Sequence, residues 1–344
     1  MGNETTVNWF ILLGFSNVTS YTLLLFAVFL CIYIATVLCN VTIIVIINVD
    51  DALHIPMYFF LLNLSFLEIG YTSVTIPKLL ENILALDKTI SLRACAAQMY
   101  FFLFFGATEC CLLAVMAYDR YIAICNPLRY PIVMRKRTCI QLAALSWVCG
   151  CLVALGHTTF IFRLPFCDSN VINHFFCEIQ PVLKLVCGNT YWNEIQIIVA
   201  AAFVILMPFM LILLSYIHII STILKMQSTK SRQKAFSTCS SHLAAVSLFY
   251  GTAIFIYIRP KSSYSLNVDK FFSLFYSVIT PIFNPIIYTL RNKEVKGALR
   301  KTLKRSERKL GMTRKAGRGT LTQGRKCFGL GPAKRTNCSW VAQK

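Results

Sequence analysis

Long apolar runs alternate with short charged segments along most of this 344-residue chain. A helix that crosses a bilayer needs roughly 20 mostly apolar residues. Backbone polar groups in lipid must bond within their own segment, so each run of this length predicts a helix. Seven runs meet the requirement: residues 22–48, 57–80, 94–118, 139–162, 195–224, 235–258 and 271–290.

Composition supports a membrane protein over a large soluble helical core. The chain is 56% hydrophobic and 14% charged, whereas a soluble domain carries about 25% charged residues. A soluble helical protein would need a charged face on its helices, and these long runs have none. The soluble alternative is therefore not supported. The predicted fold class is therefore an all-α membrane protein, a seven-transmembrane helix bundle over residues 22–290.

The distribution of lysine and arginine predicts the orientation, because cytoplasmic loops are enriched in these residues. If the N-terminus is outside, the inner loops and the segment from Arg291 onward hold 26 of the 34 basic residues. We expect a multi-pass plasma-membrane protein with an extracellular segment 1–21 and a cytoplasmic C-terminus. No cleavable signal peptide is evident, so the first helix is expected to act as a signal anchor. Asn3 and Asn17 are glycosylation acceptors by sequence.

The net charge of +20 is concentrated near the C-terminal end of the chain. Residues 291–303 predict a short basic amphipathic eighth helix lying on the membrane surface. Residues 304–344 contain few apolar residues and are expected to form a disordered cytoplasmic tail. Basic residues just inside a membrane are attracted to anionic lipid. Membrane lipid is thus the expected partner of this charge, and no predicted fold supports nucleic-acid binding.

Four of the 15 cysteines lie on the predicted outer side, where disulfides are stable. They are Cys95, Cys167, Cys177 and Cys187. Four cysteines permit three pairings, and the residues alone do not select one. A zinc site is the alternative, but these spacings lack the close pair that is typical of zinc motifs.

Four motifs carry most of the functional information. Asp119, Arg120 and Tyr121 end the third apolar run, and charges at such a position suggest function. The other motifs are residues 53–61, 234–243 and 281–288. In this order and spacing, the four motifs resemble those of olfactory receptors, a branch of the rhodopsin-like G-protein-coupled receptors.

The resemblance implies a receptor that binds small volatile odorants and activates a heterotrimeric G protein of the stimulatory, olfactory type, which raises cyclic AMP. It also implies the disulfides Cys95–Cys177 and Cys167–Cys187, which would hold the loop 163–194 as a lid. Arg120 is expected to pair with Asp119, and Pro285 to kink the seventh helix. The implied activation switch comprises Asp119, Arg120, Tyr121, Tyr216, His242, Asn284, Pro285 and Tyr288.

Glu68 and Glu109 place two carboxyl groups inside the second and third spans. A buried carboxylate must be protonated, paired or bound to a cation. With Asn284 nearby, the two acids predict an oxygen-lined site for Na⁺ or a shared proton. Two independently protonated glutamates are the alternative, and the family more often has aspartate at the position of Glu68. No other cofactor or metal is predicted.

The family pattern also implies a ligand pocket between the outer halves of helices 3, 5, 6 and 7. The implied residues are uncharged, which favours a neutral, largely apolar ligand. Tyr250, Tyr257 and Ser277 could each give it one hydrogen bond or could serve helix packing. The full set is Phe102, Leu103, Gly106, Ala107, Ala200, Ala201, Val204, Tyr250, Ala253, Ile254, Tyr257, Leu274 and Ser277.

Other function classes find less support. A non-olfactory rhodopsin-like receptor for another small ligand is the first alternative. A transporter is the second, although the chain shows no internal repeat. The sequence contains no nucleophile–base pairing, phosphate loop or metal-ligand cluster, so it is not expected to be an enzyme.

Overall fold

The computed structural model describes residues 7–15, 21–167, 169–257, 266–291 and 295–302. This part of the chain contains seven helices that are long and apolar enough to cross a membrane. The predicted seven-helix fold class is therefore confirmed. The spans are Thr22–Val49, Pro56–Leu84, Leu92–Cys125, Lys136–Phe162, Tyr191–Lys225, Thr229–Tyr257 and Lys270–Tyr288.

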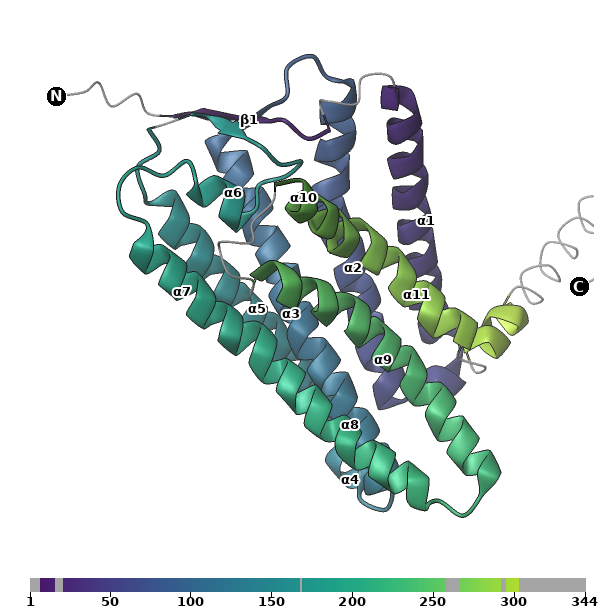
Figure 1. Cartoon of the computed structure of the whole chain (residues 1–344). Coiled ribbons are helices and arrows are strands. Elements are labelled where there is room, and N and C mark those ends of the chain that lie inside the picture. Colours follow the sequence, from purple (N-terminus) through teal and green to yellow (C-terminus); the bar gives the residue numbers. More distant parts are fainter. Residues whose placement is uncertain (1–6, 16–20, 168, 258–265, 292–294, 303–344) are drawn as a thin grey trace, which may run out of the picture. The chain divides into compact units, whose positions relative to one another are not determined.

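Most spans are single helices, and their order is shown in Figure 1. Single helices form the first four spans and the sixth: α1 (Thr22–Val49), α2 (Pro56–Leu84), α3 (Leu92–Cys125), α5 (Lys136–Phe162) and α9 (Thr229–Tyr257). Short helices occupy three connections: η2 (Asp51–Leu53), α4 (Tyr130–Val133) and α6 (Ile179–Leu183).

The fifth and seventh spans each contain one π-helical turn. The fifth consists of α7 (Tyr191–Ala201), the π-turn η3 (Ala202–Leu206) and α8 (Met207–Lys225). The seventh consists of α10 (Leu266–Leu274), the π-turn η5 (Phe275–Ile279) and α11 (Thr280–Arg291). A π-turn inserts an extra residue and therefore rotates the face that the rest of the helix presents.

Helix α3 holds the bundle together, because it contacts α2, α5, α8 and α9. Its approach to α5 is close at Gly150, where an added Cβ would lie 2.7 Å from the carbonyl oxygen of Phe104. Leucines on the outer face of α5 are exposed, with Leu145 at 65% and Leu152 at 64%. This arrangement, with polar groups inside and apolar groups outside, is suited to lipid as the solvent.

A small three-stranded sheet, which the sequence reasoning did not predict, covers one end of the bundle. β1 (Trp9–Leu12) pairs antiparallel with β2 (Thr89–Ser91) and parallel with β3 (Val171–Ile172). Phe10 and Leu12 alternate toward the interior and are fully buried. β1 and α6 lie at the same end of the bundle, opposite α4 (Figure 1). Residues 7–15, which precede the first span, are thus part of the fold.

Other predicted boundaries differ from the structure in one informative place. α3 continues to Cys125, well past the predicted end at residue 118, because Asp119 and Arg120 are buried among neighbouring helices and do not mark the helix end. Residues 295–302 are helical, within the predicted eighth helix. Asn3, Asn17 and the tail 304–344 lie outside the described residues.

Candidate ligand cavity and switch region

A loop between α5 and α7, here called the lid (residues 163–167 and 169–190), lies at the sheet-bearing end of the bundle. One disulfide joins Cys177 of the lid to Cys95 at the start of α3. A second joins Cys167 to Cys187 within the lid. These are the two pairings that the family resemblance implied. They attach the lid to the bundle and close it on itself.

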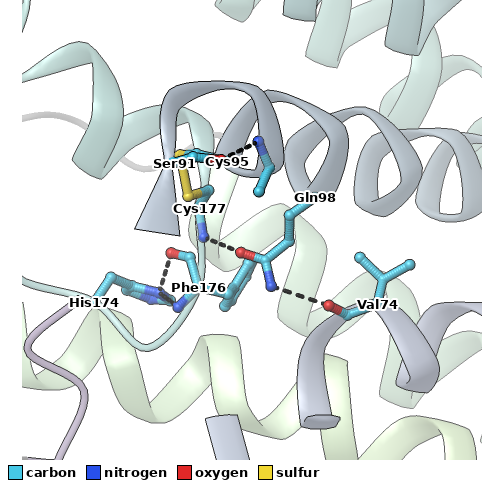
Figure 2. The surroundings of a disulfide bond; sticks show 8 residues. Val74, Ser91, Cys95, Gln98, His174, Phe176 and Cys177 are labelled. Carbon is cyan, nitrogen blue, oxygen red and sulfur yellow. Dashed lines mark hydrogen bonds between the residues drawn. A yellow bond between two sulfur atoms is a disulfide. The ribbon is translucent and has the colours of Figure 1, made fainter. Parts of the chain in front are cut away.

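Hydrogen bonds reinforce the attachment of the lid (Figure 2). The backbone N–H of Cys177 donates to Oε1 of Gln98 at 2.9 Å. Nε2 of Gln98 in turn donates to the carbonyl of Val74 at 2.9 Å. Ser91 caps α3 by accepting from the N–H of Ala94 at 3.2 Å. One buried glutamine therefore connects the lid to both α2 and α3.

A cavity lies between the helices next to the lid and contains about 680 Å³ of space not filled by atoms, part of it open to the surroundings. Ile179 of the lid-borne helix α6 is part of its lining. Many residues of the implied pocket line it: Phe102, Leu103, Gly106, Ala107, Ala200, Ala201, Val204, Ala253 and Tyr257. Its other lining residues are Tyr71, Cys110, Val153, His157, Ile197, Ile205, Phe249 and Tyr276.

Four implied pocket residues do not line this cavity. The fully buried Tyr250 instead donates its hydroxyl proton to the carbonyl of Cys110 at 2.9 Å. Ser277, also fully buried, donates to the carbonyl of Ser273 at 2.6 Å. The π-turn η5 rotates the seventh span, so Tyr276 faces the cavity while Leu274 and Ser277 do not. Of the two neighbours implied on α9, Ala253 lines the cavity and Ile254 does not.

The lid contributes a buried carboxylate beside the cavity. Glu178, directly after Cys177, is 4% exposed. Its Oε1 accepts from the hydroxyls of Tyr257 at 3.1 Å and Tyr276 at 2.9 Å. Its Oε2 accepts from the hydroxyl of Ser273 at 3.0 Å. The carboxylate therefore ties the lid to the sixth and seventh spans.

Two further residues complete this polar cluster. Nζ of Lys270 donates to the carbonyl of Gly14 at 3.1 Å and to Oδ1 of Asn173 at 2.6 Å. Nε2 of His174 lies 3.4 Å from Oε2 of Glu178. Burial, together with the charge of Lys270, lowers the pKa of His174 to about 3. The ring is neutral at neutral pH, so this contact is not an ion pair.

The opposite end of the bundle contains the implied switch residues. Arg120 is 4% exposed, and its Nε and Nη1 have no hydrogen-bond partner among the described residues. Asp119 does not form the expected ion pair with it. Instead, Asp119 accepts a 2.9 Å hydrogen bond from the hydroxyl of Tyr130 in α4. Burial and the Asp119 carboxylate raise the pKa of Tyr130, which keeps its phenol proton on this bond.

His242 connects three helices near Arg120. The hydroxyl of Tyr216 on α8 lies 2.8 Å from its Nδ1, and the carbonyl of Leu113 on α3 lies 3.1 Å from its Nε2. Tyr288 is buried, and its hydroxyl has no partner among the described residues. His242 thus closes this end of α9 onto α3.

The two remaining implied switch residues are Tyr121 on α3 and Pro285 on α11. The ring of Tyr121 lies 5.9 Å from that of His218. α11 continues as a helix through Pro285 to Arg291, and the kink expected at this proline stays a prediction. The break in α-helical geometry falls earlier, at η5.

Comparison with known proteins decides the family. A family model described as olfactory receptor matches residues 29–306. The chain belongs to the olfactory receptor family. It is 62% identical to human olfactory receptor 10C1 over 304 residues, which cover 88% of this chain and 97% of that protein. It is 54% identical to human olfactory receptor 10A5 over 303 residues, with coverage of 88% and 96%.

Membership in the olfactory receptor family confirms the resemblance found in the motifs. It also confirms a multi-pass membrane receptor that is not an enzyme. The transporter alternative is set aside on the same ground.

The two intramembrane acids of this olfactory receptor meet at one amide. Nδ2 of Asn284 donates to Oε1 of Glu68 and, at 3.3 Å, to Oε1 of Glu109. All three residues are at most 2% exposed. Oε2 of Glu68 and Oδ1 of Asn284 have no partner among the described residues. These free oxygens fit a small cation or a shared proton.

The sequence reasoning missed several residues that the olfactory receptor brings to its cavity. Tyr276 lines the cavity, and Glu178 lies directly beside it and accepts the hydroxyl proton of Tyr276. The available signal for Glu178 was an acidic residue directly after Cys177, whose disulfide partner lies on α3. The π-turns have no comparable signal in the sequence, so the face presented by Tyr276 could not be derived.

Proposed function

We propose that this olfactory receptor binds a small, mostly apolar volatile in the cavity beside its lid and activates a heterotrimeric G protein of the stimulatory type, which raises cyclic AMP. The observation that carries the proposal is the cavity itself. It is lined almost entirely by apolar and aromatic side chains and includes Ile179 from the lid. Ligand sites between helices have this character.

The proposal favours a neutral ligand over a charged one. Among the described residues that line the cavity there is no lysine, arginine, aspartate or glutamate. A charged ligand would lose its hydration there without gaining a direct counter-ion. Small lining residues such as Gly106, Ala107, Ala200 and Ala253 leave the space that an apolar chain would fill.

The opposite end of the bundle is the proposed contact for the G protein. Arg120 is buried there without a full set of partners, and His242 and Tyr216 link α9 and α8 to α3. A ligand shifts an equilibrium only by binding one state better than the other. Ligand binding would favour a state in which α9 separates from α3 and exposes Arg120.

The orientation and the ion site belong to the same proposal. The excess of lysine and arginine around residues 119–138 and 225–234 favours a cytoplasmic location for the Arg120 end. The lid would then face outward at the plasma membrane. The oxygens of Glu68, Glu109 and Asn284 would hold Na⁺ or share a proton in the resting state.

The test is cyclic AMP production in cells with confirmed surface staining, challenged with pooled neutral volatiles. Gly106→Leu fills the cavity, because a Cβ at this position already lies 3.7 Å from Tyr71. We expect this variant to lower potency by tenfold or more, roughly the loss of one buried contact of 1.4 kcal/mol.

Gly156→Leu is the matched control, since a Cβ there meets nothing within 4 Å. It should respond as the unmodified receptor does. An equal response from Gly106→Leu would contradict the assignment of the cavity. A well-displayed receptor that responds to no volatile would contradict the proposed ligand class.

A further inference from the structure

Three hydroxyl groups converge on one carboxylate at the lid end of the cavity. Tyr257 and Tyr276 donate to Oε1 of Glu178, and Ser273 donates to Oε2. The carboxylate and the Tyr276 and Ser273 side chains are almost fully buried. Hydrogen bonds to a charged acceptor are stronger than those between neutral groups, so these protons are firmly held.

The two tyrosines differ from Ser273 in one respect, because both also line the cavity. A phenol hydroxyl carries one proton and accepts through its remaining lone pairs. Since Glu178 takes the proton of Tyr257 and of Tyr276, each hydroxyl oxygen can act toward a ligand only as an acceptor. A carboxylate that does not itself line the cavity thereby fixes the polarity of its lid end.

We propose that Glu178 makes Tyr257 and Tyr276 hydrogen-bond acceptors, so that the lid end of the cavity recognises ligands that carry a hydroxyl proton, namely alcohols. The proposal rests on the odorant-binding function proposed above and specifies its ligand class. An ether or aldehyde oxygen has no proton to donate, so it would face the lone pairs of the Tyr257 and Tyr276 hydroxyl oxygens without forming a hydrogen bond. To accept such a ligand, a tyrosine would have to turn its proton away from Glu178.

That alternative is unfavourable because a buried acceptor left without its donor loses the full value of the bond. The other hydroxyls that the sequence suggested as donors do not change the picture. Tyr250 and Ser277 already donate to backbone carbonyls and do not line the cavity. His157 also lines the cavity, but from α5, whereas Tyr257 and Tyr276 lie on the sixth and seventh spans.

The experiment compares isomeric probes on the full-length receptor purified into lipid nanodiscs. Octanol and heptyl methyl ether have the same atoms, but only octanol carries a hydroxyl proton. Octanal provides a carbonyl of similar length. Equilibrium binding of each probe is measured directly, so the result does not depend on a G protein. We expect octanol to bind about three- to tenfold more tightly than the ether, the value of one hydrogen bond.

Variants test whether the preference for octanol over the ether depends on the hydroxyl oxygens of Tyr257 and Tyr276. Tyr257→Phe and Tyr276→Phe each remove one acceptor, and at least one of them should bring the octanol-to-ether ratio close to unity. Ser273→Ala is the matched control, because it removes a donor to Glu178 without altering the cavity lining. It should keep the ratio. Glu178→Gln supplies amide donors and releases tyrosine protons, so it should shift the preference toward octanal.

Several outcomes would overturn the proposal. One is equal affinity for octanol and its ether isomer in the unmodified receptor. Another is a ratio that survives both tyrosine variants while their melting temperatures stay unchanged. Failure of a folded receptor to bind any of the three probes would equally reject the alcohol assignment. Selective octanol binding without cyclic AMP production would instead contradict the proposed signalling and leave the ligand preference standing.

Discussion

The two ends of this receptor treat buried charge in opposite ways. At the lid end, the carboxylate of Glu178 accepts three hydroxyl protons and lies in a loop held by two disulfides. At the other end, the guanidinium of Arg120 is equally buried, yet Nε and Nη1 have no partner among the described residues. A satisfied buried network makes a structure rigid, whereas an unpaired buried polar group is costly. We therefore expect the lid end to be the more rigid of the two, and the Arg120 end to be the one that moves in the proposed activation.

Removing the disulfide between the lid and α3 should have the largest effect. The double variant Cys95→Ser/Cys177→Ser is expected to lose about 2–4 kcal/mol of stability, because the bond closes a long loop. Thermal unfolding of the purified receptor measures the loss. Cys31→Ser on α1 is the control, as this free cysteine is exposed. An unchanged melting temperature in the double variant would show that the lid does not depend on its cross-link.

Replacing Arg120 should raise the stability of the receptor, whereas removing the disulfide lowers it. Arg120→Leu removes a buried guanidinium whose Nε and Nη1 have no partner among the described residues, so the resting receptor should gain about 1–3 kcal/mol of stability. The same variant should lose its cyclic AMP response, since the proposed contact with the G protein is gone. Arg129→Leu, at an exposed arginine nearby, should leave the melting temperature almost unchanged. If Arg120→Leu melts lower than the unmodified receptor, the guanidinium stabilises the resting state and the contrast between the two ends fails.

The smallest effect concerns pH at the lid. A free histidine titrates near pH 6.5, whereas His174 in the closed lid has a pKa of about 3. Between these values the opened lid binds a proton that the closed lid does not. The closed lid should therefore lose up to about 1.4 kcal/mol per pH unit as the pH falls below 6.5, and stay constant above it.

Hydrogen exchange of the backbone amides in residues 169–190, compared at about pH 7.5 and about pH 5 after correction for intrinsic rates, measures this opening. His174→Gln cannot titrate, so it should abolish the pH dependence. The same slope in His174→Gln would assign the effect to another group.

The sequence predicted the spans well, because an apolar run of membrane length has few other solutions. The first predicted span, 22–48, differs from α1 by one residue. The third failed at its end because Asp119 and Arg120 were taken as a boundary, although tertiary contacts bury both. The local hydrophobic pattern carries no information about such tertiary contacts.

The site was less predictable for two physical reasons. Many residues implied by the family pattern line the cavity, but the π-turn η5 changes the face of the seventh span, so Tyr276 lines the cavity and Ser277 does not. Glu178 is positioned by a disulfide and by hydroxyls from distant segments, so no spacing in the chain reveals its partners. Chemistry that depends on long-range packing cannot be obtained from periodicity.

The parallel pairing of β1 with β3 has a consequence for biosynthesis. Residues 9–12 precede the first span, but their partners at Val171 and Ile172 follow the fourth. A ribosome delivers β1 early, and its partner strand is translated only after four helices have been made. The first strand of the chain must therefore stay unpaired on that side during most of membrane insertion, and long-range pairing of this kind is slow. A bulky fusion placed directly before Trp9 would obstruct this pairing even though the first four spans were already made.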